Sequence, residues 1–230
     1  RAAWLPLVGF AVIGVVVFYV SLPLAVDTGG ISLAYVLLYT APIWVILAAA
    51  VFLGERLAPP LIVAAGVSVL GVVALVASAG GTVNVTAVSV TWGLVSGLSY
   101  SSYYILGRRL FDRLGATLVY ALVLPAGGIV LAAAVGIAMP TAAMLGWLAL
   151  LGFGCTYLPY LLFGIGITRT GSARAVVVAM IEPVLAAAIG VAFYGEQLGL
   201  LGMAGALAVL VAAATVGIRR EAGPAEVVHP

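Results

Sequence analysis

Charged residues are scarce in this chain of 230 residues: aspartate, glutamate, lysine and arginine together make up 7% of it, whereas hydrophobic residues make up 65%. A soluble domain carries roughly a quarter charged residues, so most of this surface cannot face water. A very apolar soluble helical core would need polar faces that the hydrophobic segments lack. The composition therefore indicates an integral membrane protein.

Cysteine and histidine are nearly absent. The single Cys155 lies in an apolar segment, which excludes a disulfide framework and a cysteine metal cluster. The single His229 stands next to the last residue, in a charged tail, and is expected to face solvent. No cofactor is expected, and no basic face suggests binding to nucleic acid.

The chain contains many long hydrophobic segments. A helix needs about 20 apolar residues to cross a bilayer, and segments of that length recur at 4–26, 31–53, 59–79, 87–107, 116–138, 143–167, 173–194 and 198–218. Strands of a membrane barrel are about half as long and alternate in polarity. The sequence therefore predicts an all-α integral membrane protein with eight transmembrane helices.

The basic residues predict the orientation. If the segments alternate in direction, every basic residue falls on one side: Arg1, Arg56, Arg108, Arg109, Arg113, Arg169, Arg174, Arg219 and Arg220. Basic residues near a membrane are retained in the cytoplasm. We therefore expect a multi-pass protein of the cell (plasma or inner) membrane with a cytoplasmic C-terminus.

One hydrophobic segment has a similar copy 141 residues further along the chain. The offset pairs Pro42 with Pro183, and Gly54-Glu55 with Gly195-Glu196. Self-similarity at a fixed offset indicates a duplicated unit. Residues 1–80 then form a first repeat of three helices, 87–220 a second repeat of five, and 221–230 a cytoplasmic tail.

The offset also predicts the size of the whole bundle. It places the start of the first repeat about 54 residues before Arg1, which is room for two more helices. We therefore expect a ten-helix bundle of five plus five. An odd number of helices per repeat inverts the second copy, an arrangement typical of secondary transporters with a site near the midplane between the halves.

These motifs resemble a known family. The helix ends "GERL" and "YGEQL" and the "EPV" at 182–184 are similar to those of the EamA family of the drug/metabolite transporter superfamily. The resemblance covers the whole chain, with the first repeat short by two helices. It implies a ten-helix bundle with both termini cytoplasmic, alternating access through a central cavity, and export of amino acids, other small metabolites or drugs.

The expected function is therefore a secondary-active or facilitative transporter. Its expected partners are a small-molecule substrate and the lipid bilayer, with protons as a candidate coupling ion. The alternatives are a membrane-embedded enzyme and a membrane scaffold without transport activity. An enzyme is not expected, because the chain has no HExxH motif, no paired aspartates and no intramembrane histidine. The oligomeric state stays open.

Glu182 is the most informative candidate residue. It lies nine residues into a predicted span, near the bilayer centre, where a charge costs several kcal/mol. Such a carboxyl group is expected to be neutral, paired, or in contact with a watery cavity. It would suit proton coupling or a substrate ammonium group. The alternative is a neutral side chain that bonds to a backbone group freed by Pro183.

Other candidate residues are weaker. Prolines within a span remove a backbone hydrogen bond and favour kinks that can line a cavity, which applies to Pro42 and Pro183. Hydroxyl-bearing residues expected to line the cavity are Tyr39, Ser96, Tyr100 and Tyr160, although tyrosines also form interfacial belts. Glu55 and Glu196 end their helices, where a structural role is expected: contact with interfacial water or with backbone donors of the next helix.

Overall fold

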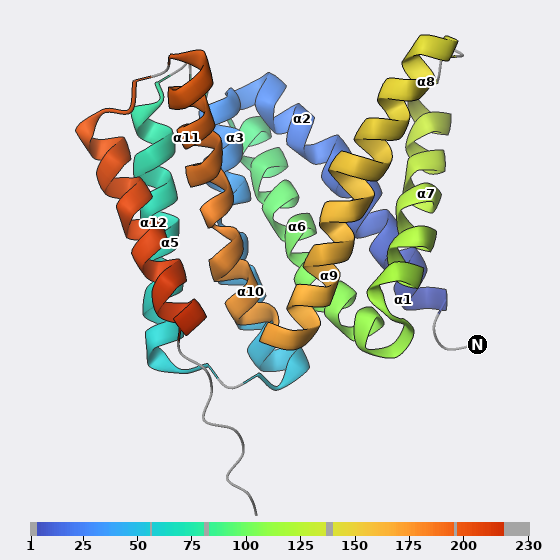
Figure 1. Cartoon of the computed structure of the whole chain (residues 1–230), viewed down its shortest axis with the longest axis horizontal. Helices are drawn as coiled ribbons and strands as arrows, with labels where there is room; N and C mark the ends of the chain where they lie inside the picture. The colour runs from blue at the N-terminus through green and yellow to red at the C-terminus, as the bar shows by residue number, and fades with distance from the viewer. Residues whose placement is uncertain (1–3, 56, 81–82, 137–139, 196, 219–230) are drawn as a thin grey trace, which may run out of the picture.

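The computed structural model describes residues 4–55, 57–80, 83–136, 140–195 and 197–218, and these residues form a bundle of helices without a strand (Figure 1). The helical elements up to residue 80 are α1 (Trp4–Phe10), η1 (Ala11–Val17), α2 (Phe18–Gly29), α3 (Ile31–Leu38), α4 (Ala41–Ala48), η2 (Ala49–Leu53) and α5 (Pro59–Ser78). Those that follow are α6 (Ala87–Leu114), α7 (Ala116–Val135), α8 (Ala142–Ala149), η3 (Leu150–Tyr157), α9 (Leu158–Thr170), α10 (Ser172–Ala179), α11 (Ile181–Tyr194) and α12 (Leu200–Ile218). The elements η1, η2 and η3 are π-helical stretches that continue the neighbouring α-helices.

The expected spans are confirmed. Seven helices of the described residues are long and apolar enough to cross a membrane: Trp4–Gly29, Ile31–Leu53, Pro59–Ser78, Ala116–Val135, Ala142–Thr170, Ser172–Tyr194 and Leu200–Gly217. The eighth expected segment is α6, which is 28 residues long but less apolar. The chain is therefore an all-α, multi-pass membrane protein.

Helix α6 is less apolar because it faces protein rather than lipid. It packs against η1, α2, α3, α4, α7 and α9. Small residues allow this close packing: a Cβ atom added at Gly97 would lie 2.8 Å from the Leu37 carbonyl oxygen. The hydroxyl of Ser101 donates to the Gly97 carbonyl at 2.8 Å, so this polar group is satisfied inside its own helix.

Two spans are broken in the middle, and the prolines mark both breaks. Helix α3 ends before Tyr39 and α4 starts with Pro42 in its first turn. Likewise, α10 ends at Ala179, and α11 starts with Pro183 in its first turn. Proline is tolerated in a first turn because its missing N–H has no partner there in any helix. Each span therefore consists of two half-helices, where the sequence suggested only a kink.

The two broken spans have matching backbones but opposite directions. Gly30 and Gly171 precede the first half-helices, both with φ of 85° and with ψ of 159° and 157°. Gly54 and Gly195 follow the second half-helices with φ of 65° and 69°. In Figure 1, the α3–α4–η2 span ends at the bottom of the bundle, whereas α11 ends at the top.

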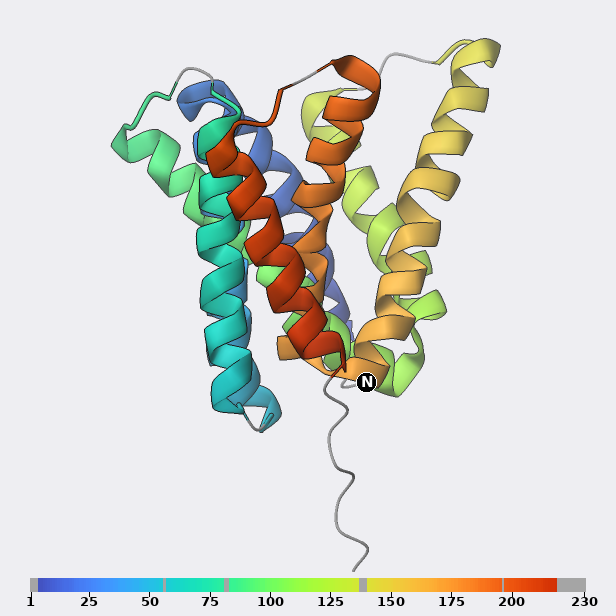
Figure 2. The ribbon, with the colours of Figure 1, turned by 60° about the vertical axis from the view of Figure 1, so that its left-hand side comes forward.

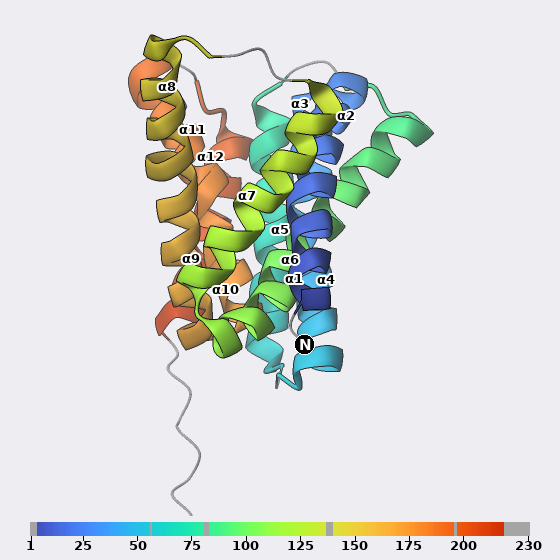
Figure 3. The same ribbon diagram turned by 90° about the vertical axis from the view of Figure 1, so that its right-hand side faces the viewer.

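Lateral packing of the bundle is uneven. In the α1–α2 span, 39% of the most hydrophobic stretch is buried, against 6% for the α8–α9 span. The first of these spans is covered by α6 and by α7, which contacts α1 and η1 (Figure 3). The α8–α9 span stands at the margin of the bundle (Figure 2) and, among the described residues, packs mainly on α6 and α7.

Candidate functional site

The break between α10 and α11 positions Glu182. The residue lies in the first turn of α11, where unpaired backbone N–H groups and the positive end of the helix dipole favour an anion. The residue is exposed, yet its carboxyl group is partly surrounded by protein. The break therefore places a carboxyl group at the start of a half-helix, in the middle of a span.

Three tyrosines lie close enough to Glu182 to interact with its charge: Tyr39, Tyr100 and Tyr104. Tyr39 is buried at the break between α3 and α4. The hydroxyl of Tyr104 donates to the hydroxyl of Tyr100 at 3.3 Å. Glu182 and these three tyrosines thus come from the two broken spans and α6.

An aromatic cluster continues from Tyr100 toward the end of the bundle that carries Arg108 and Arg109, which we call the arginine end. The ring of Tyr100 stacks on Phe18 with centroids 5.7 Å apart. Beyond it, Tyr103 stacks on Tyr160 at 5.2 Å with an interplanar angle of 9°. The hydroxyls of Tyr160 and Tyr19 are 3.5 Å apart, and these two residues are also related by the 141-residue offset. The cluster fills the space between the α1–α2 span, α6 and α9.

The candidate residues from the sequence separate into groups. Tyr39 and Tyr100 gather near Glu182, and Tyr160 belongs to the aromatic cluster. Pro42 is buried and Pro183 is half-buried, each beside a break. Ser96 is fully buried, and its hydroxyl donates to the Gly93 carbonyl of its own helix at 2.7 Å. Its hydroxyl is therefore turned to the backbone and not toward Glu182.

Tyr104 was missed by the sequence reasoning, although a signal existed. It lies four residues after Tyr100 on α6, so the two rings share one helix face and meet at 5.5 Å. Glu196 falls outside the described residues.

Glu55 makes contacts with a distant helix. Its Oε1 accepts a hydrogen bond from the backbone N–H of Ser172 at 2.8 Å, and its Oε2 accepts one from Ala173 at 3.1 Å. Both donors belong to the first turn of α10. The helix that Glu55 contacts here is α10, 117 residues away, whereas the sequence suggested α5, the next helix.

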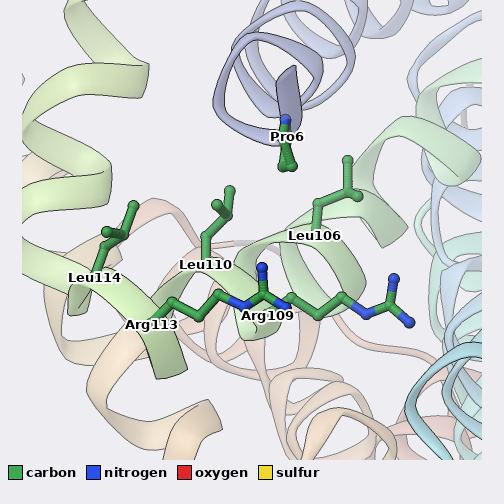
Figure 4. A pocket seen from close by; sticks show the side chains of 6 residues that line it. All are labelled: Pro6, Leu106, Arg109, Leu110, Arg113 and Leu114. Atoms are coloured by element: carbon green, nitrogen blue, oxygen red, sulfur yellow. The ribbon is translucent and has the colours of Figure 1, made fainter. Parts of the chain in front are cut away.

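A pocket of about 410 Å³ lies elsewhere, where α1 begins and α6 ends (Figure 4). Its lining residues are Pro6, Leu106, Arg109, Leu110, Arg113 and Leu114. None of them is among the residues near Glu182, and the two guanidinium groups would not attract a cation. We therefore place the candidate site at the broken spans and not in this pocket. No cluster of three or more histidine, cysteine, aspartate or glutamate side chains occurs among the described residues.

Comparisons with known proteins agree with this architecture. The model of the EamA-like transporter family matches residues 1–77 and 87–218. An uncharacterized transporter of Archaeoglobus fulgidus is 28% identical over 192 residues, which cover 81% of this chain and 67% of the relative. The uncharacterized transporter YcbK of Bacillus subtilis is 31% identical over 122 residues, which cover 49% of this chain and 39% of the relative.

A solved structure shares the fold. A chain described as "Crystal structure of protein" superposes with a TM-score of 0.78 at 20% identity, over 95% of this chain and 79% of that chain. Of the two curated relatives named above, this chain spans about two thirds of the Archaeoglobus fulgidus transporter and well under half of YcbK. The family expected from the repeated helix ends is confirmed: the chain belongs to the EamA-like transporter family.

Proposed function

We propose that the complete protein is a secondary transporter that exports a small organic solute by alternating access. The observation that carries the proposal is the pair of broken spans with Glu182 at the start of one half-helix. Discontinuous helices near the midplane form the substrate and ion sites of many secondary transporters. Membership of the EamA-like family supports the same function.

The chemistry around Glu182 favours a positively charged group on the solute. A carboxylate attracts an ammonium group, and the faces of tyrosine rings attract cations as well. Of the three tyrosines that interact electrostatically with Glu182, Tyr39 and Tyr104 are buried and Tyr100 is half-buried, so Tyr100 is the ring that a solute can reach. Amino acids, amine metabolites and cationic drugs all carry the required group. Glu182 could equally hold the proton of a proton-coupled exporter, and the test below separates the two roles.

Flux measurements in proteoliposomes test the proposal. Radiolabelled amino acids and organic cations would be supplied to the full-length protein, with and without a pH gradient. Glu182→Gln keeps the shape of the side chain but can neither ionise nor titrate. We expect it to abolish flux of a cationic solute, or the dependence of flux on pH. Asp27→Asn, the same chemical change at an exposed residue near the end of α2, is the matched control.

The two roles and a purely structural role give different results. If Glu182 binds the solute, Glu182→Gln weakens binding even without a gradient, as measured by solute protection or calorimetry. If it carries the proton, binding persists and the gradient loses its effect. Wild-type flux and pH dependence in Glu182→Gln would remove the residue from transport, and no flux of any solute by the wild type would contradict the proposed function itself.

We also propose that two further helices complete the bundle and cover the α8–α9 span, as α6 and α7 cover the α1–α2 span. The 141-residue offset supports this arrangement. So does the difference in burial, since 6% of the most hydrophobic stretch is buried in the α8–α9 span and 39% in the α1–α2 span. We therefore expect residues 1–230 alone to give no flux, and a chain extended by its preceding two helices to transport. Saturable flux by residues 1–230 alone would contradict the proposal.

A further inference from the structure

A charged contact joins the two broken spans at the arginine end of the bundle. The Glu55 carboxylate, at the end of the first, accepts the two backbone hydrogen bonds from Ser172 and Ala173, at the start of the second. The first N–H groups of a helix have no partner inside it. A carboxylate satisfies them with charge-assisted bonds and also interacts favourably with the helix dipole.

Local backbone geometry directs Glu55 toward α10. Gly54 is left-handed with φ of 65°, and the Glu55 N–H donates to the Ala49 carbonyl at 3.1 Å, which closes the end of η2. On the other side, Gly171 has φ of 85°, and a Cβ atom there would lie 3.4 Å from the Glu55 Oε2. The two glycines therefore allow the chain to turn so that the carboxylate meets the helix start.

Helix α6 supports the same contact. The Arg108 Nη1 is 3.6 Å from the Glu55 Oε1 and donates to the Ile167 carbonyl of α9 at 3.2 Å. Arg109 donates to the Phe52 carbonyl of η2. The Ser172 hydroxyl donates to the Tyr104 carbonyl at 2.7 Å. Four spans thus meet around one carboxylate.

One face of α10 is buried between this contact and Glu182. Along α10 the side chains of Ala173, Val176, Val177 and Met180 are at most 2% exposed. Glu182 lies ten residues after Ser172, about 15 Å away at 1.5 Å per residue. A path for water or solute along this buried face, from the arginine end to Glu182, therefore requires the start of α10 to move away from η2 and α6.

We infer that Glu55 is a gating residue: its contact with the start of α10 closes the arginine end, and the release of that contact opens a path to Glu182. The contact is suited to release because water reaches both partners. The side chains of Glu55 and Arg108 are 21% and 23% exposed, so water can replace the hydrogen bonds when the helices separate. This inference rests on the proposed transport function, but its test measures accessibility and not flux.

A cysteine reporter behind the contact tests the inference. In full-length protein, in detergent or nanodiscs, Cys155→Ser removes the exposed native thiol, and Val176→Cys places a thiol at a position that is 1% exposed. Adding Glu55→Gln removes the charge that holds the two N–H groups. We expect an aqueous maleimide to label Val176→Cys faster by on the order of tenfold, because bonds to a charged acceptor are among the stronger hydrogen bonds.

Two controls separate gating from unfolding. Asp112→Asn removes the other carboxylate that contacts Arg108, at 3.0 Å, but leaves α10 capped, so labelling of Val176→Cys should stay within about twofold, as for an exposed pair of small energetic weight. Val72→Cys reports on a buried position in a separate core cluster, and its labelling should not change in Glu55→Gln.

The outcomes are distinct. Unchanged labelling of Val176→Cys in Glu55→Gln would overturn the inference, because the contact would then not hold the arginine end closed. An equal rise at Val72→Cys would also overturn it, since Glu55 would then stabilise the whole fold and not a gate. A failure of Glu182→Gln to alter flux leaves these labelling results unaffected, so the two proposals fail separately.

Discussion

The contact between α5 and α12 offers a sharp test of helix packing through Gly71→Ala. The two helices approach closely at glycines: a Cβ atom at Gly71 would lie 2.7 Å from the Gly205 carbonyl oxygen and 2.8 Å from the Val209 Cγ2. Small residues allow such backbone approach between membrane helices. An alanine at position 71 must therefore push α12 away.

The loss of stability in Gly71→Ala can be estimated from these distances. A carbon atom ordinarily stays about 3.3 Å or more from a carbonyl oxygen, so the helices must separate by about 0.6 Å. Overpacking of this kind costs about 1–3 kcal/mol. The gain in helix propensity from glycine to alanine, up to about 1 kcal/mol, offsets part of that cost. We expect a net loss of about 1–2 kcal/mol in the free energy of unfolding.

Gly66→Ala, on the same helix, is the matched control. A Cβ atom at Gly66 has no atom within 4 Å, so this variant should be neutral or slightly stabilised. Thermal unfolding in detergent would compare the two variants. At roughly 2–4 °C per kcal/mol for a domain of this size, Gly71→Ala should melt several degrees below Gly66→Ala. Equal melting temperatures would refute the argument that backbone contact sets the distance between α5 and α12.

Three further predictions concern single sites. Gly171→Ala should lower the free energy of unfolding by about 1–3 kcal/mol, because only glycine adopts φ of 85° with ψ of 157° without strain; Gly166→Ala, which has free space, should not, and equal thermal stability of the two would contradict this. Tyr120→Phe should be neutral or stabilising by up to about 1 kcal/mol in the same assay, because its buried hydroxyl has no hydrogen-bond partner among the described residues; a clear loss would show that a partner exists. With the arginine end in the cytoplasm, an impermeant thiol reagent should label Asn84→Cys on intact cells and Asp112→Cys only after lysis, and the reverse pattern would overturn the orientation.

The spans could be predicted because hydropathy acts along continuous segments. Pro42 and Pro183 were informative for the same local reason: proline limits its own turn wherever the rest of the chain lies. The sequence could not show that each span divides into two half-helices at the turn residues Tyr39, Thr40 and Met180. Tyr39 and Met180 are buried in one core cluster, and such contacts between distant segments cannot be read from a local pattern.

The candidate site was harder to predict because it depends on which helix faces pack against one another in the tertiary fold. The spacing of Ser96 and Tyr100 suggested a polar face on one helix. In the structure, consecutive residues from Ser101 to Tyr104 are all buried, so protein surrounds this part of α6 on every side and not on one face only. The Ser96 hydroxyl bonds to the backbone of its own helix. The partner of Glu55 could not be predicted either. A carboxylate at a helix end can accept hydrogen bonds from the start of any helix, and the tertiary fold decides which helix start lies beside it.

The separation of 117 residues between Glu55 and Ser172 has a consequence for biosynthesis. A ribosome adds roughly 5–20 residues per second, so roughly 6–23 s pass after the synthesis of Glu55 before its donors are made. During that interval the carboxylate remains hydrated at the membrane surface, and the helices that follow it insert without this contact. The arginine end can close only after α10 enters the membrane, which makes closure one of the last steps in the assembly of the nascent chain.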